Sequence, residues 1–452
     1  MKSQFLLAAA HSGAGKTTVV LGLLRALRRR GYRVQPFKCG PDFIDPIHHR
    51  AASGRDSVNL DRYMMSDAHI RDLYDRYGAD ADVSITEGVM GLFDGSVKSE
   101  GSSADLAKML GLPVILVLNA KAMAYSAAAI LYGLKHFDPA VRIAGVLFNF
   151  VETAAHYRLL QEACADVGIP ALGYLPANAG LRIPSRHLGL DTGNADAAIT
   201  AAADHIEQQI DLEGLLRVTA RAGNAGGVRE GAAAAYERVA GTSVAGGRKT
   251  ILVARDAAFH FLYPENIRRL EQWGSVQYFS PLVATQLPAE TDLLYLPGGY
   301  PELYLAELAG NRSLLEDLQR YAAGGGKILA ECGGMMYLGR SISDEAGKSY
   351  QMAGILAIDT GMERKKLSLG YRTVTLPQGS MKGHEFHYSQ YISQEERDAG
   401  KAYNARGEQV EAPLFYTSNL LASYMHLYWG EEMGFLENWL QGRAVKGRGT
   451  GG

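Results

Sequence analysis

The chain has 452 residues, of which 47% are hydrophobic and 21% are charged. These values predict a globular protein of two or three domains, each large enough to bury a core of its own. With 46 basic and 48 acidic side chains, the formal net charge is -2. This balance argues against a nucleic-acid partner, because nucleic-acid-binding proteins usually carry a basic excess.

The three cysteines, Cys39, Cys164 and Cys332, are too few for a disulfide framework and suit a reducing compartment. The first residues have neither the apolar core nor the cleavage site of a signal peptide. No apolar run reaches the length of about 18 residues that a membrane-spanning helix needs. We therefore expect a cytoplasmic protein without a membrane partner.

The first half of the chain alternates short apolar runs with helical patterns. Continuous apolar runs, which are typical of parallel strands buried on both faces, occur at residues 5–10, 83–86, 114–118 and 143–148. Residues 17–30 and 103–110 show the periodicity of helices. The pattern predicts an α/β domain with a parallel sheet over residues 1–220.

A second domain is expected after a change in composition. Residues 221–248 are rich in glycine and alanine, which predicts a flexible linker. New strand patterns at 250–254, 293–296 and 327–331 predict a second α/β domain over residues 249–441. The glycine-rich residues 442–452 are expected to form a disordered tail.

A phosphate-binding loop is predicted between the first strand and the first helix. Residues 11–18 read His-Ser-Gly-Ala-Gly-Lys-Thr-Thr, although Ala10 replaces the usual first glycine. In such a loop the lysine reaches the terminal phosphates of ATP, and the first threonine hydroxyl binds Mg²⁺. The expected nucleotide ligands from the loop are Gly13, Gly15, Lys16, Thr17 and Thr18.

Acidic residues follow two of the predicted strands, at the edge where open parallel sheets bind their ligands. Glu87 begins a glycine-rich loop at 87–95, and Asp94 lies near its end. Asp45 lies in Gly-Pro-Asp-Phe-Ile-Asp-Pro at 40–46. Because Mg²⁺ prefers oxygen ligands, Glu87 and Asp45 are candidate metal ligands with Thr17. Surface charges, or an ordinary turn at 40–46, are the alternative explanations.

The second domain contains a candidate nucleophile. Residues 327–338 predict a strand, a sharp turn and a helix, with Cys332 on the turn, which is the arrangement of a nucleophile elbow. A helix N-terminus is expected to lower the pKa of the thiol. Backbone N–H groups of Gly299 and Gly333 could stabilise an oxyanion, and His426 is the candidate base.

His384 and His387 are an alternative to His426. Their spacing could serve a metal, but no further Cys/His cluster completes such a site. A strand that contributes substrate contacts, or a group that orients His426, fits this segment better.

Taken in order along the chain, these sequences resemble the cobyrinate a,c-diamide synthase family of corrinoid amidotransferases. The resemblance covers nearly the whole chain outside the linker and the tail. It is carried by residues 12–18, 40–46, Asn-Leu-Asp at 59–61, 87–95, Arg-His-Leu-Gly-Leu at 186–190, Pro-Gly-Gly-Tyr-Pro-Glu at 297–302 and Glu-Cys-Gly-Gly-Met-Met-Tyr at 331–337.

The resemblance implies a dethiobiotin-synthetase-like P-loop domain, followed by a class I glutamine amidotransferase domain. It implies that ATP converts the a and c carboxylates of the macrocycle into acyl phosphates, which ammonia released from glutamine at Cys332 then attacks. The substrates would be a corrinoid macrocycle, glutamine and ATP with Mg²⁺. Asp45, Glu87 and Asp94 would serve metal, phosphoryl and substrate positioning, and Asn149 would read the adenine.

One departure concerns the glutaminase triad. The family's usual glutamate two residues after the histidine is replaced by Tyr428, so the third member is unassigned, with Glu385 as a hypothesis. Hydrogenobyrinic acid or nickel-sirohydrochlorin could replace cobyrinic acid as the substrate, and a homodimer is one assembly that the sequence leaves open. A P-loop nucleotide-switch protein of the partitioning-ATPase type is the alternative from another class, but it would not explain the elbow around Cys332.

Overall fold

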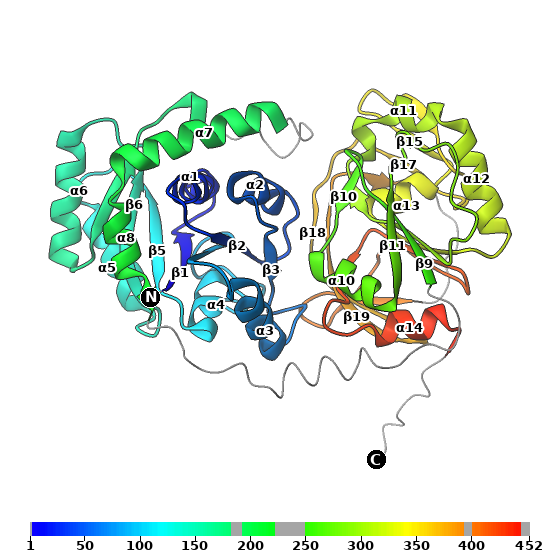
Figure 1. The fold of residues 1–452 in the computed structure, drawn as a ribbon, viewed down its shortest axis with the longest axis horizontal. Coiled ribbons are helices and arrows are strands. Elements are labelled where there is room, and N and C mark those ends of the chain that lie inside the picture. Colours follow the sequence, from blue (N-terminus) through cyan, green and yellow to red (C-terminus); the bar gives the residue numbers. More distant parts are fainter. Residues whose placement is uncertain (1, 182–191, 222–248, 393–399, 444–452) are drawn as a thin grey trace, which may run out of the picture. The chain divides into compact units, whose positions relative to one another are not determined.

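The computed structural model describes residues 2–181, 192–221, 249–392 and 400–443. It divides the chain into two compact units, Met1–Gly227 and Val228–Gly452 (Figure 1). Residues 222–248 of the expected linker, residues 444–452 of the expected tail and the sequence at 186–190 lie outside the described residues.

The N-terminal unit is built on a parallel sheet with the strand order β3-β2-β4-β1-β5-β6-β7. A short strand, β8 (Ala220–Arg221), pairs antiparallel with β1. Arg221 therefore belongs to this unit and not to the linker in which the composition placed it. The parallel strands are β1 (Lys2–Ala9), β2 (Val34–Cys39), β3 (Val58–Leu60), β4 (Val83–Glu87), β5 (Val114–Asn119), β6 (Ile143–Asn149) and β7 (Ala171–Leu175).

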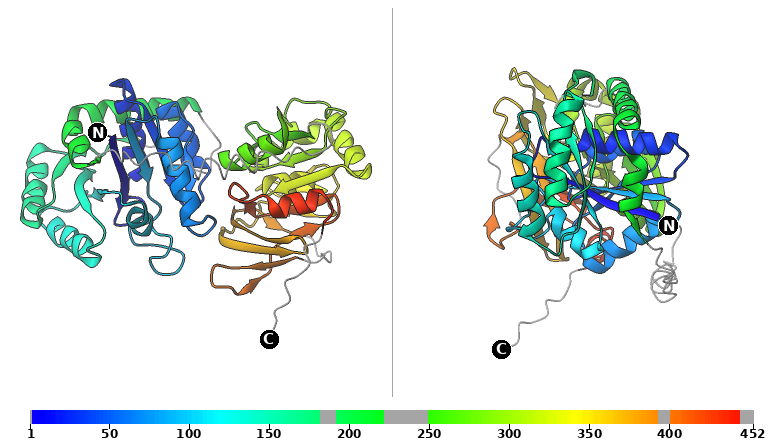
Figure 2. Two further views of the ribbon diagram at one scale, coloured as in Figure 1. Left: turned by 60° about the horizontal axis from the view of Figure 1, so that its bottom comes forward. Right: turned by 90° about the vertical axis from the view of Figure 1, so that its left-hand side faces the viewer.

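Helices cover both faces of this sheet (Figures 1 and 2). On one face, apolar side chains of α1 and α7 join the same buried cluster as Phe5 and Ile85 of the sheet. A methyl group on Gly22 of α1 would lie 2.8 Å from Ile206 of α7, so glycine permits this close approach. The helices are α1 (Lys16–Arg29), α2 (Ile44–Ser53), α3 (Asp67–Gly78), α4 (Ser103–Leu110), α5 (Ala127–Phe137), α6 (Ala154–Val167), η1 (Ala179–Leu181), α7 (Thr192–Gln209) and α8 (Leu212–Val218).

The C-terminal unit contains a mainly parallel six-stranded sheet with the order β11-β9-β12-β14-β24-β23. Only β23 runs antiparallel to its neighbour. The strands are β9 (Lys249–Ala254), β11 (Gly274–Phe279), β12 (Leu293–Leu296), β14 (Lys327–Glu331), β23 (Leu414–Tyr416) and β24 (Leu420–Ser423). The helices of the unit are α10 (Pro264–Trp273), η2 (Pro301–Leu303), α11 (Leu305–Gly310), α12 (Arg312–Ala323), α13 (Gly333–Leu338) and α14 (Gly434–Leu440).

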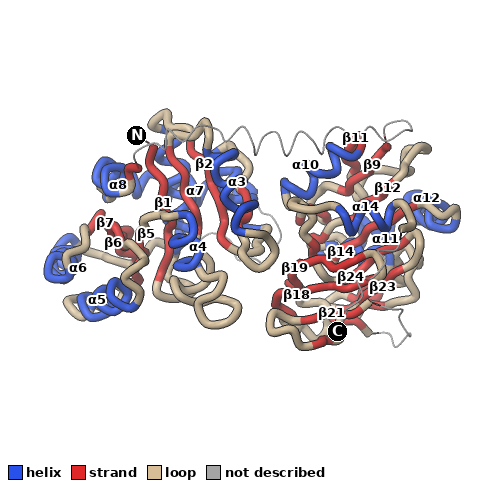
Figure 3. The backbone as a smooth tube through the Cα atoms, turned by 90° about the horizontal axis from the view of Figure 1, so that it is seen from below, coloured by secondary structure: helices blue, strands red, loops and turns tan. Residues whose placement is uncertain are grey.

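A second sheet in this unit is antiparallel, with the order β22-β21-β18-β19-β25. Its long hairpin of β18 and β19 is visible in Figure 3. The strands are β18 (Ser368–Leu376), β19 (Gly379–His387), β21 (Lys401–Tyr403), β22 (Gln409–Val410) and β25 (His426–Leu427). Short strands form two small sheets: β10 (Phe259–Phe261) with β13 (Gly298–Gly299), and β15 (Ser341–Ser343), β16 (Ser349–Gln351), β17 (Asp359–Gly361) and β20 (Gln390–Tyr391).

The two faces of the six-stranded sheet bury different clusters. Ile328 packs on one face with Leu314 and Leu318 of α12. The next residue, Leu329, packs on the other face in a cluster that includes Trp429 and residues of β18 and β19. This alternation is the two-residue period of a strand, and it explains why the sheet reads as continuously apolar.

The predicted fold class, a P-loop parallel-sheet domain followed by a second α/β domain, is confirmed. Each of the strands predicted from apolar runs overlaps an observed strand. The expectation for the tail is wrong at its first residues, because the N–H groups of Gly442 and Arg443 donate to carbonyls of α14. Among the described helices, none is long and apolar enough to cross a membrane.

Candidate active sites

The phosphate loop joins β1 to α1. Gly13 and Gly15 adopt left-handed conformations, with φ of 80° and 89°, which glycine reaches without steric cost. A methyl group on Gly15 would lie 2.0 Å from Nδ2 of Asn149. That same Nδ2 donates to the carbonyl of Ala14 at 3.0 Å, and Oδ1 of Asn149 accepts from the N–H of Phe150 at 3.0 Å. Asn149 thus binds the backbone of the phosphate loop through its side chain. The expectation that Asn149 reads the adenine did not include this contact.

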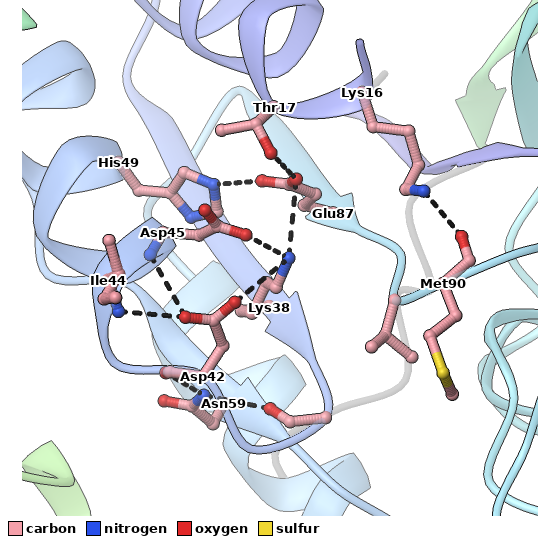
Figure 4. A network of polar contacts seen from close by, with 12 residues as sticks. Lys16, Thr17, Lys38, Asp42, Ile44, Asp45, His49, Asn59, Glu87 and Met90 are labelled. Carbon is pink, nitrogen blue, oxygen red and sulfur yellow. Dashed lines mark hydrogen bonds and ion pairs between the residues drawn. The ribbon is translucent and has the colours of Figure 1, made fainter. Parts of the chain in front are cut away.

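The loop residues turn toward the neighbouring strand ends (Figure 4). Oγ1 of Thr17 donates to Oε1 of Glu87 at 2.7 Å, and Nζ of Lys16 donates to the carbonyl of Met90 at 2.5 Å. Burial lowers the pKa of Lys16, while the charges of Glu87 and Asp94 act in the opposite direction. Thr18 points elsewhere, with Oγ1 donating to the carbonyl of Leu181 at 3.4 Å.

A buried lysine links the two acidic loops (Figure 4). Nζ of Lys38 lies 2.5 Å from Oδ2 of Asp45, 3.4 Å from Oε1 of Glu87 and 3.8 Å from Oδ2 of Asp42. Burial alone would lower the pKa of Lys38, but the three carboxylates outweigh it and raise that pKa well above its usual value. Lys38 is therefore a fixed positive charge, which sequence analysis missed.

Glu87 has a second buried partner, which sequence analysis also missed. Nε2 of His49, on α2, lies 2.6 Å from Oε2 of Glu87, and Nδ1 of His49 lies 2.9 Å from Oγ of Ser57. Burial and the charge of Asp45 would raise the pKa of Glu87, but Lys38 and His49 more than offset them and hold that pKa below its usual value. Glu87 is thus an ionised carboxylate beside the Thr17 hydroxyl.

The proposed Mg²⁺ ligands fit the arrangement unevenly. Thr17 and Glu87 bring two oxygen atoms within 2.7 Å of each other. Oxygen atoms are the ligands that Mg²⁺ prefers. Asp45 instead contacts the ammonium group of Lys38, so its placement as a direct metal ligand is not supported. Within the described ranges, no group of three or more His, Cys, Asp and Glu side chains is arranged as a metal site.

Asp94 occupies a different position from the other acidic residues. It is exposed, and its Oδ2 accepts from the N–H of Gly91 at 2.9 Å within the loop that follows β4. Its charge acts on Lys16 and raises the pKa of that lysine. Asp94 therefore belongs to the electrostatic surroundings of the phosphate loop.

In the C-terminal unit, Cys332 occupies the sharp turn between β14 and α13. Its φ of 47° is rare for a residue other than glycine, and its N–H donates to the carbonyl of Ser423 at 2.7 Å. Such a strained conformation is characteristic of a nucleophile elbow, because it presents the side chain at the end of the sheet. The predicted strand, turn and helix are all present.

The base and the oxyanion donors lie around the same point. A methyl group on Gly298 would lie 2.2 Å from Cε1 of His426 and 3.3 Å from Cβ of Cys332, so His426 and Cys332 flank this glycine. A methyl group on Gly333 would lie 3.3 Å from the backbone N of Gly299. The backbones of both predicted oxyanion residues are thus close to the nucleophile.

The protonation state of Cys332 differs from the sequence expectation. Burial raises the pKa of its thiol well above the usual range, the nearby Glu302 adds to this, and the Gly333 N–H only partly opposes it. α13 has only six residues, so its N-terminal end is too weak to reverse the effect of burial. Burial, together with His384 and His387, holds the pKa of His426 well below its usual value. The resting pair is therefore a neutral thiol and a neutral imidazole.

Glu385, the hypothetical third member of the triad, pairs with another side chain. Its Oε2 lies 2.6 Å from Nη2 of Arg372 on the neighbouring strand β18. The adjacent residue, His384, is the one in register with His426, and the two rings stack with centroids 5.1 Å apart. Because adjacent residues of a strand face opposite sides, this arrangement does not favour Glu385 as the acceptor for the His426 ring.

His384 and His387 have separate surroundings. Nδ1 of His384 lies 3.1 Å from the hydroxyl of Tyr263, whereas Nδ1 of His387 lies 2.9 Å from the carbonyl of Ser389. The ring of His387 stacks on Tyr424 at a centroid distance of 3.8 Å. These contacts do not bring the two histidines together around a common ligand.

A P-loop domain followed by a domain with a Cys–His nucleophile elbow defines a nucleotide-dependent glutamine amidotransferase. Comparison with family models agrees: residues 5–190 match the CobQ/CobB/MinD/ParA nucleotide binding domain. Residues 250–433 match the CobB/CobQ-like glutamine amidotransferase domain.

Full-length relatives identify the family. A hydrogenobyrinate a,c-diamide synthase of Brucella suis biovar 1 is 40% identical over 436 residues, covering 94% of this chain and 98% of its own length. A cobyrinate a,c-diamide synthase of Salmonella typhimurium is 39% identical over 455 residues, covering 96% and 97%. The chain belongs to this family of a,c-diamide synthases, which are ATP-dependent glutamine amidotransferases.

Proposed function

We propose that this protein amidates the a and c carboxylates of a corrinoid macrocycle, with ATP as the activator and glutamine as the nitrogen donor. The observation that carries the proposal is the presence of two chemically distinct sites in a chain whose relatives carry the corresponding names. One site offers a phosphate loop with Lys16 and the nearby buried Lys38 of β2, and the other offers a cysteine, a histidine and backbone oxyanion donors. A nucleotide-switch protein would require only the first site.

In the N-terminal unit, the substrate carboxylate attacks the γ-phosphorus of ATP, which forms an acyl phosphate and releases ADP. Lys16 and Lys38 provide positive charge for the phosphoryl oxygens, and His49 fixes Glu87 in place. Mg²⁺, when bound to Thr17 and Glu87, neutralises charge on the phosphates. Ammonia then attacks the acyl carbon and loses a proton to become the amide. Inorganic phosphate leaves with the electrons of the broken carbon–oxygen bond and takes up that proton.

In the C-terminal unit, His426 removes the thiol proton as Sγ of Cys332 attacks the amide carbon of glutamine. Because burial raises the pKa of the thiol and lowers the pKa of the imidazole, the proton passes from Cys332 to His426 as the attack proceeds. The N–H groups of Gly299 and Gly333 receive the oxyanion. His426 returns the proton to the departing ammonia, and water then releases glutamate from the thioester.

The identity of the macrocycle is tested by mass spectrometry. The purified protein is incubated with ATP, Mg²⁺ and glutamine, and in parallel with cobyrinic acid, hydrogenobyrinic acid and nickel-sirohydrochlorin. We expect two successive amidations of cobyrinic or hydrogenobyrinic acid, since the relatives carry both names. No mass change on any of the three would contradict the proposed substrate class.

We further propose that the protein works in the cytoplasm, without a nucleic-acid or membrane partner, and that a homodimer is its assembly. The near-neutral charge and the absence of a membrane-spanning helix from the described residues are consistent with this location. Cell fractionation tests the location, and light scattering of the purified protein tests the assembly.

A further inference from the structure

The strand that carries His426 is held on one edge by the antiparallel sheet. His426 of β25 is in register with His384 of β19. Two residues later, the N–H of Tyr428 donates to the carbonyl of Lys382 at 2.9 Å. The backbone groups of Leu427 and Trp429 face the other edge of β25. There, buried side chains take the place of a neighbouring strand and bind these backbone groups.

Glu331 fills the first of these positions. Its Oε1 accepts from the N–H of Leu427 at 2.9 Å, and its Oε2 accepts from the hydroxyl of Tyr295 at 2.8 Å. Glu331 is 2% exposed and ends β14, directly before Cys332. Glu331, which precedes the nucleophile Cys332, is therefore hydrogen-bonded to Leu427, which follows the base His426.

Asn266 of α10 fills the second position. Its Nδ2 donates to the carbonyl of Leu427 at 2.9 Å, and its Oδ1 accepts from the N–H of Trp429 at 2.9 Å. Together, Glu331 and Asn266 satisfy three backbone groups that a neighbouring strand would otherwise bind. A buried backbone group without such a partner destabilises the fold, because it loses its hydrogen bonds to water and gains none in the protein.

We propose that Glu331 is the positioning residue of the glutaminase, and that it fixes His426 relative to Cys332 through the backbone of β25. The inference rests on the proposed glutaminase function. The residue two positions after His426 is Tyr428, so a carboxylate at the family's usual place is missing. Glu331 provides a carboxyl contact one residue from His426 instead, and it acts on the strand and not on the imidazole ring.

The test compares three variants of the full chain. Glu331→Ala removes both hydrogen bonds. Glu331→Gln retains an oxygen for the Leu427 N–H and reverses the second bond, so that the amide N–H donates to the Tyr295 oxygen. Leu329→Ala is the matched control: Leu329 lies on the same strand and is also buried, but it makes neither contact. Glutamate release from glutamine, ammonia-dependent amidation and the melting temperature are measured for each.

For Glu331→Ala we expect glutaminase kcat to fall about 100-fold, the loss that a misplacement of about 1 Å can cause. The KM for glutamine and the ammonia-dependent activity should change little. Glu331→Gln should restore kcat to within a few-fold of wild type. Leu329→Ala should lower the melting temperature at least as much, yet keep most of its glutaminase activity.

Wild-type kcat in Glu331→Ala would overturn the inference, as would a loss in Leu329→Ala equal to that in Glu331→Ala. If Glu331→Ala does not fold, Glu331→Asp, which shortens the side chain, takes its place in the same comparison with Glu331→Gln. Absence of glutaminase activity in the wild-type protein would instead contradict the proposed function itself, so the two failures are distinguishable.

Discussion

The ammonium group of Lys38 lies 2.5 Å from the carboxylate of Asp45, and both side chains are almost fully buried in the N-terminal unit. The sequence suggested Asp45 as a candidate metal ligand or a residue that positions the substrate. The ammonium group of Lys38 also lies beside Glu87, 3.4 Å from its Oε1, and its charge acts on Lys16 of the phosphate loop. Phosphoryl transfer depends largely on such fixed charges, so we expect amidation to depend on Lys38.

Lys38→Met is expected to abolish amidation with either nitrogen donor. The substitution leaves Asp45 buried without its cation, and breaking a buried ion pair in this way costs about 3–5 kcal/mol. Amidation with glutamine and with ammonia is compared with glutamine hydrolysis, whose residues lie in the other unit. An active Lys38→Met variant would contradict the assigned role of the lysine.

Glu87→Gln is expected to reduce amidation about 100-fold with both donors and to raise the Mg²⁺ concentration needed for half-maximal rate. The amide keeps nearly the same volume but removes the charge that faces Thr17 and His49. Asp94→Asn and Asp45→Asn should also impair amidation with both donors. Normal turnover in all three variants would contradict the placement of the synthetase site.

Gly298→Ala is expected to eliminate glutamine hydrolysis and to spare ammonia-dependent amidation. The added methyl group would lie 2.2 Å from Cε1 of His426, a distance that forces the imidazole away from Cys332. Gly310→Ala serves as the control, because a methyl group there has no neighbour within 4 Å. Equal glutaminase rates in the two variants would refute the proposed geometry.

Glu331 is expected to make the free energy of unfolding depend on pH. Burial raises the pKa of its carboxyl from 4.5 to about 8, so between these values the folded protein binds a proton that the unfolded chain has released. The stability that the protonated Glu331 carboxyl contributes is therefore fully present below pH 4.5. As pH rises toward 8 it is lost, and the free energy of unfolding falls by about 1.4 kcal/mol per pH unit.

Glu331→Gln isolates this effect, because an amide does not titrate in this range. The melting temperature of wild type relative to Glu331→Gln should fall steadily from pH 5 to pH 8. A difference that is constant with pH would show that the Glu331 carboxyl is ionised in the folded protein at every pH tested.

Much of the fold and of the two sites could be predicted from sequence, because the features that identify them are local. The buried parallel strands read as continuous apolar runs, and the turns that carry Lys16 and Cys332 have recognisable composition. Features that depend on distant segments were missed. Lys38 lies within a fully buried strand, and His49 within a helix, and only the fold brings their side chains to Glu87.

The pKa of Cys332 was predicted in the wrong direction for a similar reason. The sequence indicates a helix N-terminus, which lowers a thiol pKa. Burial of Cys332, which depends on how distant segments pack around the elbow, raises that pKa and has the larger effect. Likewise, the hairpin of β18 and β19 was not predicted, since few of the side chains along β18 are fully buried. The register that aligns His384 with His426 therefore could not be inferred.

We propose that glutamine hydrolysis and carboxylate amidation are carried out at separate sites. Product formation by Cys332→Ala with each nitrogen donor tests this separation. We expect this variant to form no product with glutamine, while its rate with ammonia stays within a few-fold of wild type. Equal loss with both donors would contradict that division of labour.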